Sequence, residues 1–434
     1  MKDIRNITAE AVQLLKEMVA IKSPSFGEDA VCSHIKGWLT DKGISHKRIG
    51  NNIVAEHITD PDKSVLLLCA HIDTVTAGED WDFDPYRPDY KKAAEIISDN
   101  LRMNRNDYAE IASCCLQSED IVAGLGSNDD GASVVAMIAA YRYFVERSFA
   151  SLKMTTEKLR MTEEKLRMTE GNSRRSGDML ERTEERTPNL VLVLTCEEER
   201  SGKGGMTQLW PDVLAKLEAS QKYAIIGEPT GMKAATSERG LLVIDAEAKG
   251  KSGHAARNEG ENAIYIALED IEKLRNHEFS RISPRMGKVN LNVTQVNAGT
   301  AHNVIPYRCT FVIDIRPTEQ YTNEEILEEL QSICRSTLTA RNLTNRSSAT
   351  YPESPLQKTA EALGIETFSS PTTSDWMRIG CDAIKMGPGE SSRSHKKDEF
   401  VTIEEIENGI RTYIEFINNL QRYLDFARDD NDRL

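Results

Sequence analysis

Three short apolar runs constrain this chain most, because each one ends in side chains that can bind a metal ion or a proton. Their sequences are SVLLLCAHID at 64–73, NLVLVLTCEEE at 189–199 and KYAIIGEPT at 222–230. Each run is short and does not alternate, so each predicts a strand that is buried on both faces. Between the first two lies GLGSNDDGASVVAMIAAY, a glycine-rich loop that leads into an apolar helix. Strands that alternate with helices indicate an α/β layer architecture.

The pattern changes near residue 239 and predicts a smaller α+β domain. GLLVIDAEAKG at 240–250 alternates like a half-exposed strand, and 288–297 and 307–316 are typical of a strand pair. Thr322 and Glu325 form a capping box that opens a second helix. The first helix covers 263–274, with a predicted buried stripe of Ile264, Ala267, Leu268 and Ile271. A weak strand near 343–350 would complete a ferredoxin-like order.

We therefore predict a discontinuous domain, 1–237 and 351–434, into which a domain of 238–350 is inserted. A second capping box, Thr402 with Glu405, opens its C-terminal helix. Two helical insertions are predicted at about 89–120 and 151–187. The latter holds a seven-residue repeat with leucines at 152, 159 and 166. A solvated helix is the favoured interpretation of this repeat, and a partner-binding coiled coil is the alternative.

Composition excludes several classes of function. The chain has 54 Lys and Arg against 69 Asp and Glu, a net charge of −15, which argues against nucleic acid and anionic membranes as partners. It has no apolar stretch of about 20 residues and no signal-peptide pattern at its start. The eight cysteines are scattered without a CxxC motif. They indicate reduced thiols and a cytoplasmic protein.

Each acid or histidine that follows a predicted strand has, taken alone, a common explanation other than metal binding. Asp129 or Asp130 would serve as a helix N-cap, and three consecutive glutamates are usually solvated. His395 lies in a loop rich in Gly, Pro and Ser, where a surface histidine is the common case. Together, however, they place several carboxylates at one sheet edge, where a cation must offset their repulsion. Histidine with carboxylate ligands suits catalytic Zn²⁺.

Eight motifs in this order make the chain resemble the M20 family of dinuclear zinc peptidases and deacylases. They are HID, GLGSNDDG, CEEE, GEPT, GKSGHAA, HNVIPYRC, DIRP and GPGESSRSHKKDEF. The resemblance covers nearly the whole chain except the two insertions, and is greatest to the acetylornithine deacetylase group. It implies a zinc-peptidase-like catalytic domain with a mixed central sheet, and an inserted ferredoxin-like domain through which two copies form a homodimer.

The resemblance also implies a metal site. Two Zn²⁺ ions, with Co²⁺ or Mn²⁺ as substitutes, would be held by His71, Asp129, Glu199, Glu228 and His395. Asp129 would bridge them and be followed by a cis peptide bond, although this chain has Asp130-Gly131 where the family often has Met-Lys-Gly. Glu198 matches the general base. The alternative is that the alignment of the three glutamates with the family motif is shifted by one residue. Asp73 matches the acid that orients His71.

Four further residues match substrate-binding positions. His254 matches a histidine that reaches the other subunit's active site and stabilises the oxyanion, and Asn303 matches a substrate contact. Arg316 matches the arginine that binds the substrate carboxylate, a role suited to a guanidinium, which can donate two hydrogen bonds to one carboxylate. The alternative is that Arg316 is only a surface residue of a strand. Asp375, in TTSDW, would meet a cationic or ureido side chain.

The implied reaction is hydrolysis of an N-acyl amino acid by a metal-activated water, with Glu198 as the base. The favoured substrate is N-acetyl- or N-succinyl-L-ornithine, or the citrulline analogue, in arginine biosynthesis. Alternatives within the family are a succinyl-diaminopimelate desuccinylase, a di- or tripeptidase and an aminoacylase. An alternative of another class is a non-catalytic scaffold, which would contain little metal.

Overall fold

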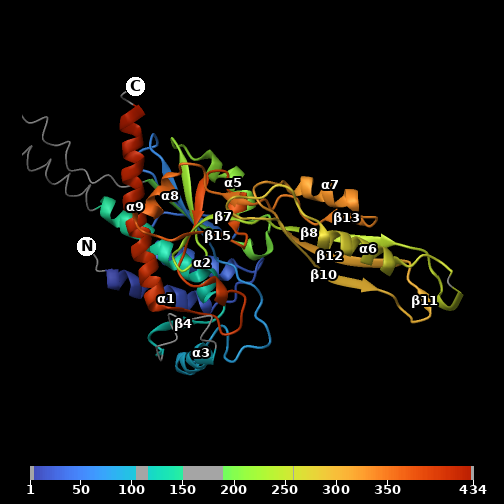
Figure 1. Ribbon diagram of the computed structural model, residues 1–434. Coiled ribbons are helices and arrows are strands. Elements are labelled where there is room, and N and C mark those ends of the chain that lie inside the picture. The colour runs from blue at the N-terminus through green and yellow to red at the C-terminus, as the bar shows by residue number, and fades with distance from the viewer. Residues whose placement is uncertain (1–3, 104–115, 150–188, 258, 432–434) are drawn as a thin grey trace, which may run out of the picture. The chain divides into compact units, whose positions relative to one another are not determined.

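The computed structural model of this protein describes residues 4–103, 116–149, 189–257 and 259–431 (Figure 1). The chain forms two compact units. Unit 1 comprises Met1–Ala234, Glu353–Glu366 and Gly380–Leu434, and unit 2 comprises Ala235–Pro352 and Thr367–Ile379.

Unit 1 is built on a mixed sheet whose strands lie in the order β1-β2-β5-β3-β6-β16. The strands β5, β3, β6 and β16 are parallel, whereas β1 and β2 are antiparallel to their neighbours. All seven residues of β3 and all seven of β5 are buried. The three predicted buried strands are thus confirmed. The bounds are β1 Lys47–Ile49, β2 Asn52–His57, β3 Val65–His71, β5 Asn189–Thr195, β6 Lys222–Ile226 and β16 Asp382–Lys385.

Helices pack on this sheet and form its main core. The predicted helix after the glycine-rich loop covers 132–149. The capping box that opens α9 is confirmed, since the Glu405 N–H lies 3.1 Å from the Thr402 hydroxyl and the Thr402 N–H lies 2.8 Å from the Glu405 carboxylate. The isoleucines of α9 join α1 and the 132–149 helix in one core cluster. The other helices are α1 Ile4–Val19, α2 Asp29–Asp41, α5 Met206–Asp212, α8 Pro355–Ala362 and α9 Ile403–Asn431.

The first predicted insertion is helical, as expected, but it has a core of its own. Helix α3, Tyr90–Met103, buries Ala93, Ala94, Ile97 and Leu101. They pack with residues of β4, Ile121–Ala123, and of β17, Phe400–Thr402, which pair antiparallel. The second predicted insertion, 151–187 with its leucine repeat, lies outside the described residues.

Unit 2 contains an antiparallel sheet in the order β10-β12-β8-β13, with α6 against β8, β10 and β12. The chain order strand–helix–strand–strand–helix–strand is the predicted ferredoxin-like one. Burial along β8 alternates, as the sequence predicts for a half-exposed strand. The capping box of Thr322 and Glu325 opens α7. The bounds are β8 Leu242–Lys249, α6 Ala263–Asn276, β10 Asn290–Ala298, β12 Arg308–Arg316, α7 Asn323–Ile333 and β13 Thr337–Ala340.

The predicted last strand of unit 2 is wrong in detail. The strand that completes the sheet is β13, whose Leu338 lies opposite Ala246 and is buried. Residues Ser348–Ala349 form β14 instead, which pairs with β7, Ala234–Glu238. Short strands complete the fold: β9 Gly253–His254 pairs with β11 Val304–Ile305, and β15 is Thr367–Ser370.

The predicted stripe of α6 is wrong at one position: Ala267 is buried and Ile271 packs against the core, but Leu268 is 54% exposed. The helix buries a stripe that contains Asp270. The Asp270 carboxylate accepts hydrogen bonds from the Arg335 N–H at 3.0 Å and from the Ser336 N–H and hydroxyl at 2.7 Å each. These three donors satisfy the buried charge. They turn the helix face that carries Asp270 inward and leave Leu268 outside.

None of the helices in the described part of the chain is long and apolar enough to cross a membrane. The six cysteines in the described ranges are free, and four of them are buried. The burial of these four agrees with the prediction that several cysteines lie in the core.

Candidate metal centre

The end of β3 supplies the first two site residues. His71 is the last residue of the strand and is 3% exposed, and Asp73 is fully buried. The Nδ1 atom of His71 lies 2.9 Å from the Asp73 carbonyl oxygen and 3.6 Å from its carboxylate. The same carboxylate accepts hydrogen bonds from the backbone N–H groups of Glu198 and Glu199, at 3.0 and 3.2 Å. Asp73 therefore orients the imidazole and also holds the loop that carries the two glutamates.

The glycine-rich loop places Asp129 between two histidines. Its Oδ1 lies 3.2 Å from His71 Nε2, and its Oδ2 lies 3.6 Å from His395 Nε2. Asp130 faces elsewhere, with its carboxylate 3.4 Å from the His71 backbone N–H. The peptide bond between the two aspartates is cis, as the family resemblance implies. A side chain at Gly131 would collide with the Gly126 carbonyl oxygen, so the tight turn requires glycine there.

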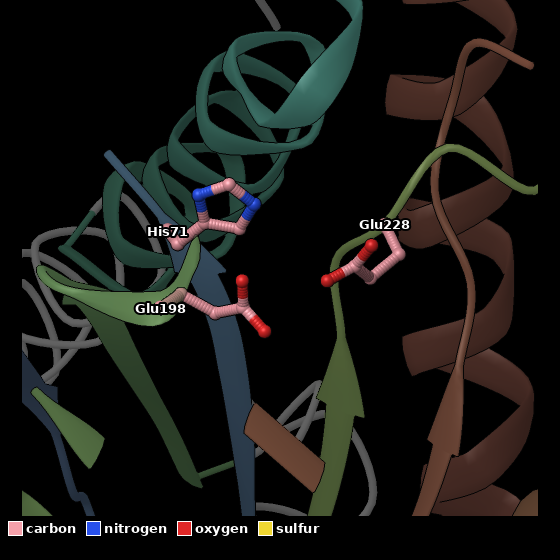
Figure 2. A group of neighbouring side chains, drawn as sticks. All are labelled: His71, Glu198 and Glu228. Atoms are coloured by element: carbon pink, nitrogen blue, oxygen red, sulfur yellow. The ribbon is translucent and has the colours of Figure 1, made fainter. Parts of the chain in front are cut away.

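The run of three glutamates divides its side chains between two tasks. Glu197 has a positive φ of 61° and accepts a hydrogen bond from the Gly204 N–H at 2.8 Å, so it shapes its own loop. The Glu199 carboxylate lies 2.9 Å from His395 Nε2. Glu198, His71 and Glu228 each offer a ligand atom within 4.8 Å of the others. Figure 2 shows the carboxylates of Glu198 and Glu228 pointing into the same space beside the His71 ring.

The loop that presents His395 is anchored by a buried ion pair. Arg393 is 3% exposed, and its two terminal nitrogens each lie 2.9 Å from the Glu405 carboxylate. Its guanidinium also stacks 4.3 Å above the Phe400 ring. This bidentate pair joins the loop to the capped start of α9. No sequence pattern indicated this pair, because Arg393 and Glu405 lie in two different local patterns.

A further buried acid, Glu399, escaped the sequence reasoning. It is 2% exposed and accepts hydrogen bonds from the backbone N–H groups of Asn128 and Asp129, at 2.8 and 3.0 Å. Burial and the nearby charge of Asp129 raise the pKa of Glu399 to about 8. The only signal was an acid four residues after His395, which is too common a pattern to select it.

Two acids of this cluster have raised pKa values. Burial, followed by the negative charge of Asp129, raises the pKa of Glu228 well above its usual range. Burial likewise raises the pKa of Asp130 to about 8. A divalent cation would reverse the repulsion between these carboxylates. Imidazole nitrogens and carboxylate oxygens are the ligands that zinc takes in catalytic sites, so the residues fit the predicted pair of metal ions. Within the described ranges, a second group of possible ligands consists of His71, Asp129 and Glu199.

The predicted substrate residues of unit 2 do not all lie together. His254 pairs with Val304 in the short β9–β11 ladder, and the Ala255 N–H donates to the Asn303 carbonyl oxygen at 3.1 Å. His254 and Asn303 are thus neighbours, and both are exposed. Arg316 ends β12 at the other end of the sheet, roughly 25 Å away along the strand. Its guanidinium pairs with Asp314, at 2.8 and 3.1 Å.

Asp375 lies apart from these residues in the sequence and is buried. It starts a short 3₁₀ turn whose N-cap is Ser374. The Ser374 hydroxyl donates to the buried Glu238 carboxylate at 2.7 Å. The turn is therefore fixed to β7 within unit 2.

Comparison with known proteins shows what the chain is similar to. A profile of the M20 peptidase dimerisation domain matches residues 236–341. Acetylornithine deacetylase of Myxococcus xanthus is 28% identical over 241 residues, which cover 50% of this chain and 61% of that protein. Succinyl-diaminopimelate desuccinylase of Wolbachia pipientis is 23% identical over 439 residues, which cover 94% of this chain and 93% of that protein. The chain thus contains a match to the M20 peptidase dimerisation domain and is similar to a deacetylase and to a desuccinylase.

Solved structures agree with the M20 fold. The M20 metallo-carboxypeptidase Sso-CP2 of Sulfolobus solfataricus has a TM-score of 0.65 at 15% identity, covering 95% of this chain and 99% of that one. The Bacillus subtilis protein YXEP, described as a dinuclear metal binding peptidase, has a TM-score of 0.61 at 14% identity, covering 96% and 98%. The predicted fold, a mixed-sheet domain with an inserted dimerisation domain, is confirmed.

Proposed function

We propose that this M20 protein hydrolyses the amide bond of an N-acyl amino acid with the help of two divalent metal ions. The observation that carries the proposal is the position of the Asp129 carboxylate, which has one oxygen toward His71 and the other toward His395. A carboxylate between two imidazoles, with further acids around it, is suited to bridging a pair of cations.

The ligands divide between the two ions. His71 and Glu228 would join Asp129 at one ion, and Glu199 and His395 would join it at the other. Bound metal ions supply Lewis acidity and lower the pKa of water, and Zn²⁺, with Co²⁺ or Mn²⁺ as substitutes, suits these ligands. Asp73 keeps the His71 ring in place through Nδ1.

Glu198 is the proposed general base. Its backbone is held by Asp73, and its carboxylate lies within 4.8 Å of possible ligand atoms of His71 and Glu228. From there it would take a proton from the attacking water and deliver it to the leaving amine. The products would be a carboxylic acid and a free amino acid.

His254 and Arg316 are proposed to act on one substrate from two different copies of the chain. They lie at opposite ends of the unit 2 sheet, so one copy cannot bring both to the same substrate through this sheet. The dimerisation domain at 236–341 supports a homodimer in which His254 stabilises the oxyanion in the partner's site. Asn303, beside His254, would contact the same substrate.

Arg316 is proposed to bind the substrate carboxylate. Its guanidinium already meets Asp314 in the described structure, so the substrate carboxylate would share or replace this pairing. Asp375 is the proposed contact for a cationic or ureido side chain.

The favoured substrate is N-acetyl- or N-succinyl-L-ornithine, or an acylated citrulline, which would place the reaction in arginine biosynthesis. The similarity to an acetylornithine deacetylase supports this choice. The alignment with a desuccinylase covers more of the chain and keeps N-succinyl-diaminopimelate as the second candidate. The free cysteines in the described ranges support a cytoplasmic location.

A substrate panel tests the proposal. The full-length protein, supplied with Zn²⁺ or Co²⁺, would be assayed on N-acetyl- and N-succinyl-ornithine, N-acetylcitrulline, N-succinyl-diaminopimelate and dipeptides. We expect an acylated ornithine or citrulline to give the highest kcat/KM. Fastest turnover of a dipeptide would indicate a peptidase instead. A protein that binds little metal and turns over no substrate would be a non-catalytic scaffold.

The dimer is tested by light scattering and by subunit mixing. Coexpressed His254→Ala and Glu198→Gln chains should regain activity in mixed dimers, since one of the two sites then has both residues intact. Absence of any recovery, with mixed dimers present, would place His254 in its own subunit's site or outside catalysis.

A further inference from the structure

Two loops of unit 1 carry the proposed ligands Asp129 and His395, and backbone contacts join these loops where they begin and end. The strands β4 and β17 pair antiparallel. The loop with Asp129 begins directly after β4, and the loop with His395 ends directly before β17. The Gly124 N–H donates to the Glu399 carbonyl oxygen at 2.8 Å, so the pairing continues one step beyond the strands. The two loops therefore start out side by side.

Asn128 fixes the turn that precedes His395. It is fully buried, and its side-chain amide meets both backbone groups of Glu390. The Asn128 Nδ2 group donates to the Glu390 carbonyl oxygen at 3.1 Å, and the Oδ1 atom accepts from the Glu390 N–H at 2.9 Å. A Cβ atom at Gly389 would collide with the Asn128 Oδ1, so the close approach of this turn requires glycine there. One amide side chain thus pairs with this turn as a neighbouring strand would.

Glu399 makes the reciprocal contact, from the loop with His395 to the loop with Asp129. It is 2% exposed, and its Oε1 atom accepts hydrogen bonds from the N–H groups of both Asn128 and Asp129, at 2.8 and 3.0 Å. We call Asn128 and Glu399 the clamp, because each loop supplies one side chain that holds the backbone of the other. Buried polar groups that satisfy one another have few alternative arrangements. The clamp therefore restricts how far the two loops can move apart.

His395 depends on such support more than His71 does. The His71 side chain is 3% exposed and its Nδ1 atom lies 2.9 Å from the Asp73 carbonyl oxygen, whereas the His395 side chain is 54% exposed. His395 also has a positive φ of 57°, which a residue other than glycine keeps only when the surrounding structure holds it. Its Nε2 atom lies 2.9 Å from the Glu199 carboxylate and 3.6 Å from that of Asp129. These distances depend on where the loop backbone lies, and hence on the clamp.

We propose that Asn128 and Glu399 are positioning residues that set the separation between Asp129 and His395, and thereby the affinity for the second metal ion. This is the ion assigned above to Asp129, Glu199 and His395. The inference rests on the proposed function, whose metal centre it refines. Asn128 holds the loop of His395 alone, so its loss should affect mainly the second ion. Glu399 holds the backbone of the bridging Asp129, so its loss should affect both ions.

The experiment is a calorimetric titration of Zn²⁺ into the full-length protein after a chelator has removed bound metal. In the parent we expect two ions to bind. Asn128→Ala should weaken one binding step roughly 10–100-fold and leave the other nearly unchanged. The weakened step should be the one that His395→Ala abolishes. Glu399→Ala should weaken both steps, whereas Glu399→Gln keeps an oxygen that can accept the two N–H groups and should lose less affinity.

Asn189→Ala is the matched control. Asn189 is 2% exposed at the start of β5, where its Oδ1 atom accepts from the Thr59 N–H at 2.9 Å and its Nδ2 group donates to the Asp60 carbonyl oxygen at 2.6 Å. This residue also fixes a loop through both ends of a buried amide, but the three glutamates follow the opposite end of its strand. Asn189→Ala should lower the free energy of unfolding and leave both Zn²⁺ binding steps unchanged.

Two results would overturn the inference. One is the same Zn²⁺ binding in Asn128→Ala as in the parent, and the other is an equal weakening of the same step in Asn189→Ala. If Asn128→Ala fails to fold, Glu399→Ala and Glu399→Gln test the other half of the clamp, and parent-like affinities in both would also contradict it. A parent that binds no Zn²⁺ would overturn the proposed metal centre together with the clamp, so the two failures are distinguishable.

Discussion

The two sheets of this protein differ in how much of each strand is buried. In unit 1, β3 and β5 are buried at every position. In unit 2, β8 alternates between buried and exposed residues, and most of β10 is exposed. A strand covered on both faces can present functional groups only where it ends. This is where His71, Glu198 and Glu228 lie, next to one another.

The open sheet of unit 2 places its candidate residues differently. His254 and Asn303 are exposed on a short ladder beyond one end of the sheet, whereas Arg316 lies at the other end. A buried parallel sheet thus gathers residues within one chain. An open antiparallel sheet holds residues far apart, and we propose that a second copy of the chain brings them to one substrate. The predictions below test this contrast.

The largest effect is expected at Glu198. Because only this carboxylate is proposed to move the proton, Glu198→Gln should lower kcat by roughly 10²–10⁴-fold while bound metal is retained. Glu197→Gln is the matched control, since the Glu197 side chain bonds to Gly204 in its own loop. Steady-state kinetics with metal analysis measures both. A larger loss of kcat in Glu197→Gln would show that the base is assigned to the wrong glutamate.

The amount of bound metal should distinguish variants of unit 1 from a variant of unit 2. His71→Ala and His395→Ala each remove a proposed ligand, so elemental analysis should show less than the full two metal ions per chain. His254→Ala should retain both ions and lose activity only. A full complement of metal in His71→Ala would contradict the proposed centre. Treatment with a chelator should abolish turnover in the parent, and Zn²⁺ or Co²⁺ should restore it.

Stability should show the same contrast between covered and open strands. Leu67 in β3 is fully buried, so Leu67→Ala should lower the free energy of unfolding by about 2–5 kcal/mol. Val296 in β10 is 53% exposed, and Val296→Ala should change it by less than about 0.5 kcal/mol in a monomer. Denaturant titration measures both. A large loss for Val296→Ala would instead indicate that β10 is covered by another chain.

The smallest effect is expected on α6. Leu268 is 54% exposed although its spacing predicted burial, so Leu268→Lys should change the free energy of unfolding by less than about 0.5 kcal/mol. Ile266 is 5% exposed, and Ile266→Ala should cost about 2–5 kcal/mol. Equal losses in the two variants would support the stripe that the sequence predicted.

Local patterns in the sequence were sufficient for the main helices and strands and, with the family motifs, for most of the candidate site. The apolar runs predicted β3, β5 and β6, because a strand covered on both faces needs no polar residues. The capping boxes at Thr322 and Thr402 located the starts of α7 and α9, since a cap depends on residues three positions apart. The same strand ends, read with the family motifs, gave the residues that the structure brings together around Asp129.

Only the tertiary structure decided which member of each acidic run faces the site. Asp129 rather than Asp130 meets both imidazoles, and Glu197 turns away from Glu198 and Glu199. These choices depend on hydrogen bonds between distant segments, such as those from Glu198 and Glu199 to Asp73 and from Asp129 to Glu399, 270 residues away. The sequence by itself determines which acidic side chains lie near the site. The direction of each one is set by partners that folding brings close, because a buried charge must find its donors wherever they lie in the chain.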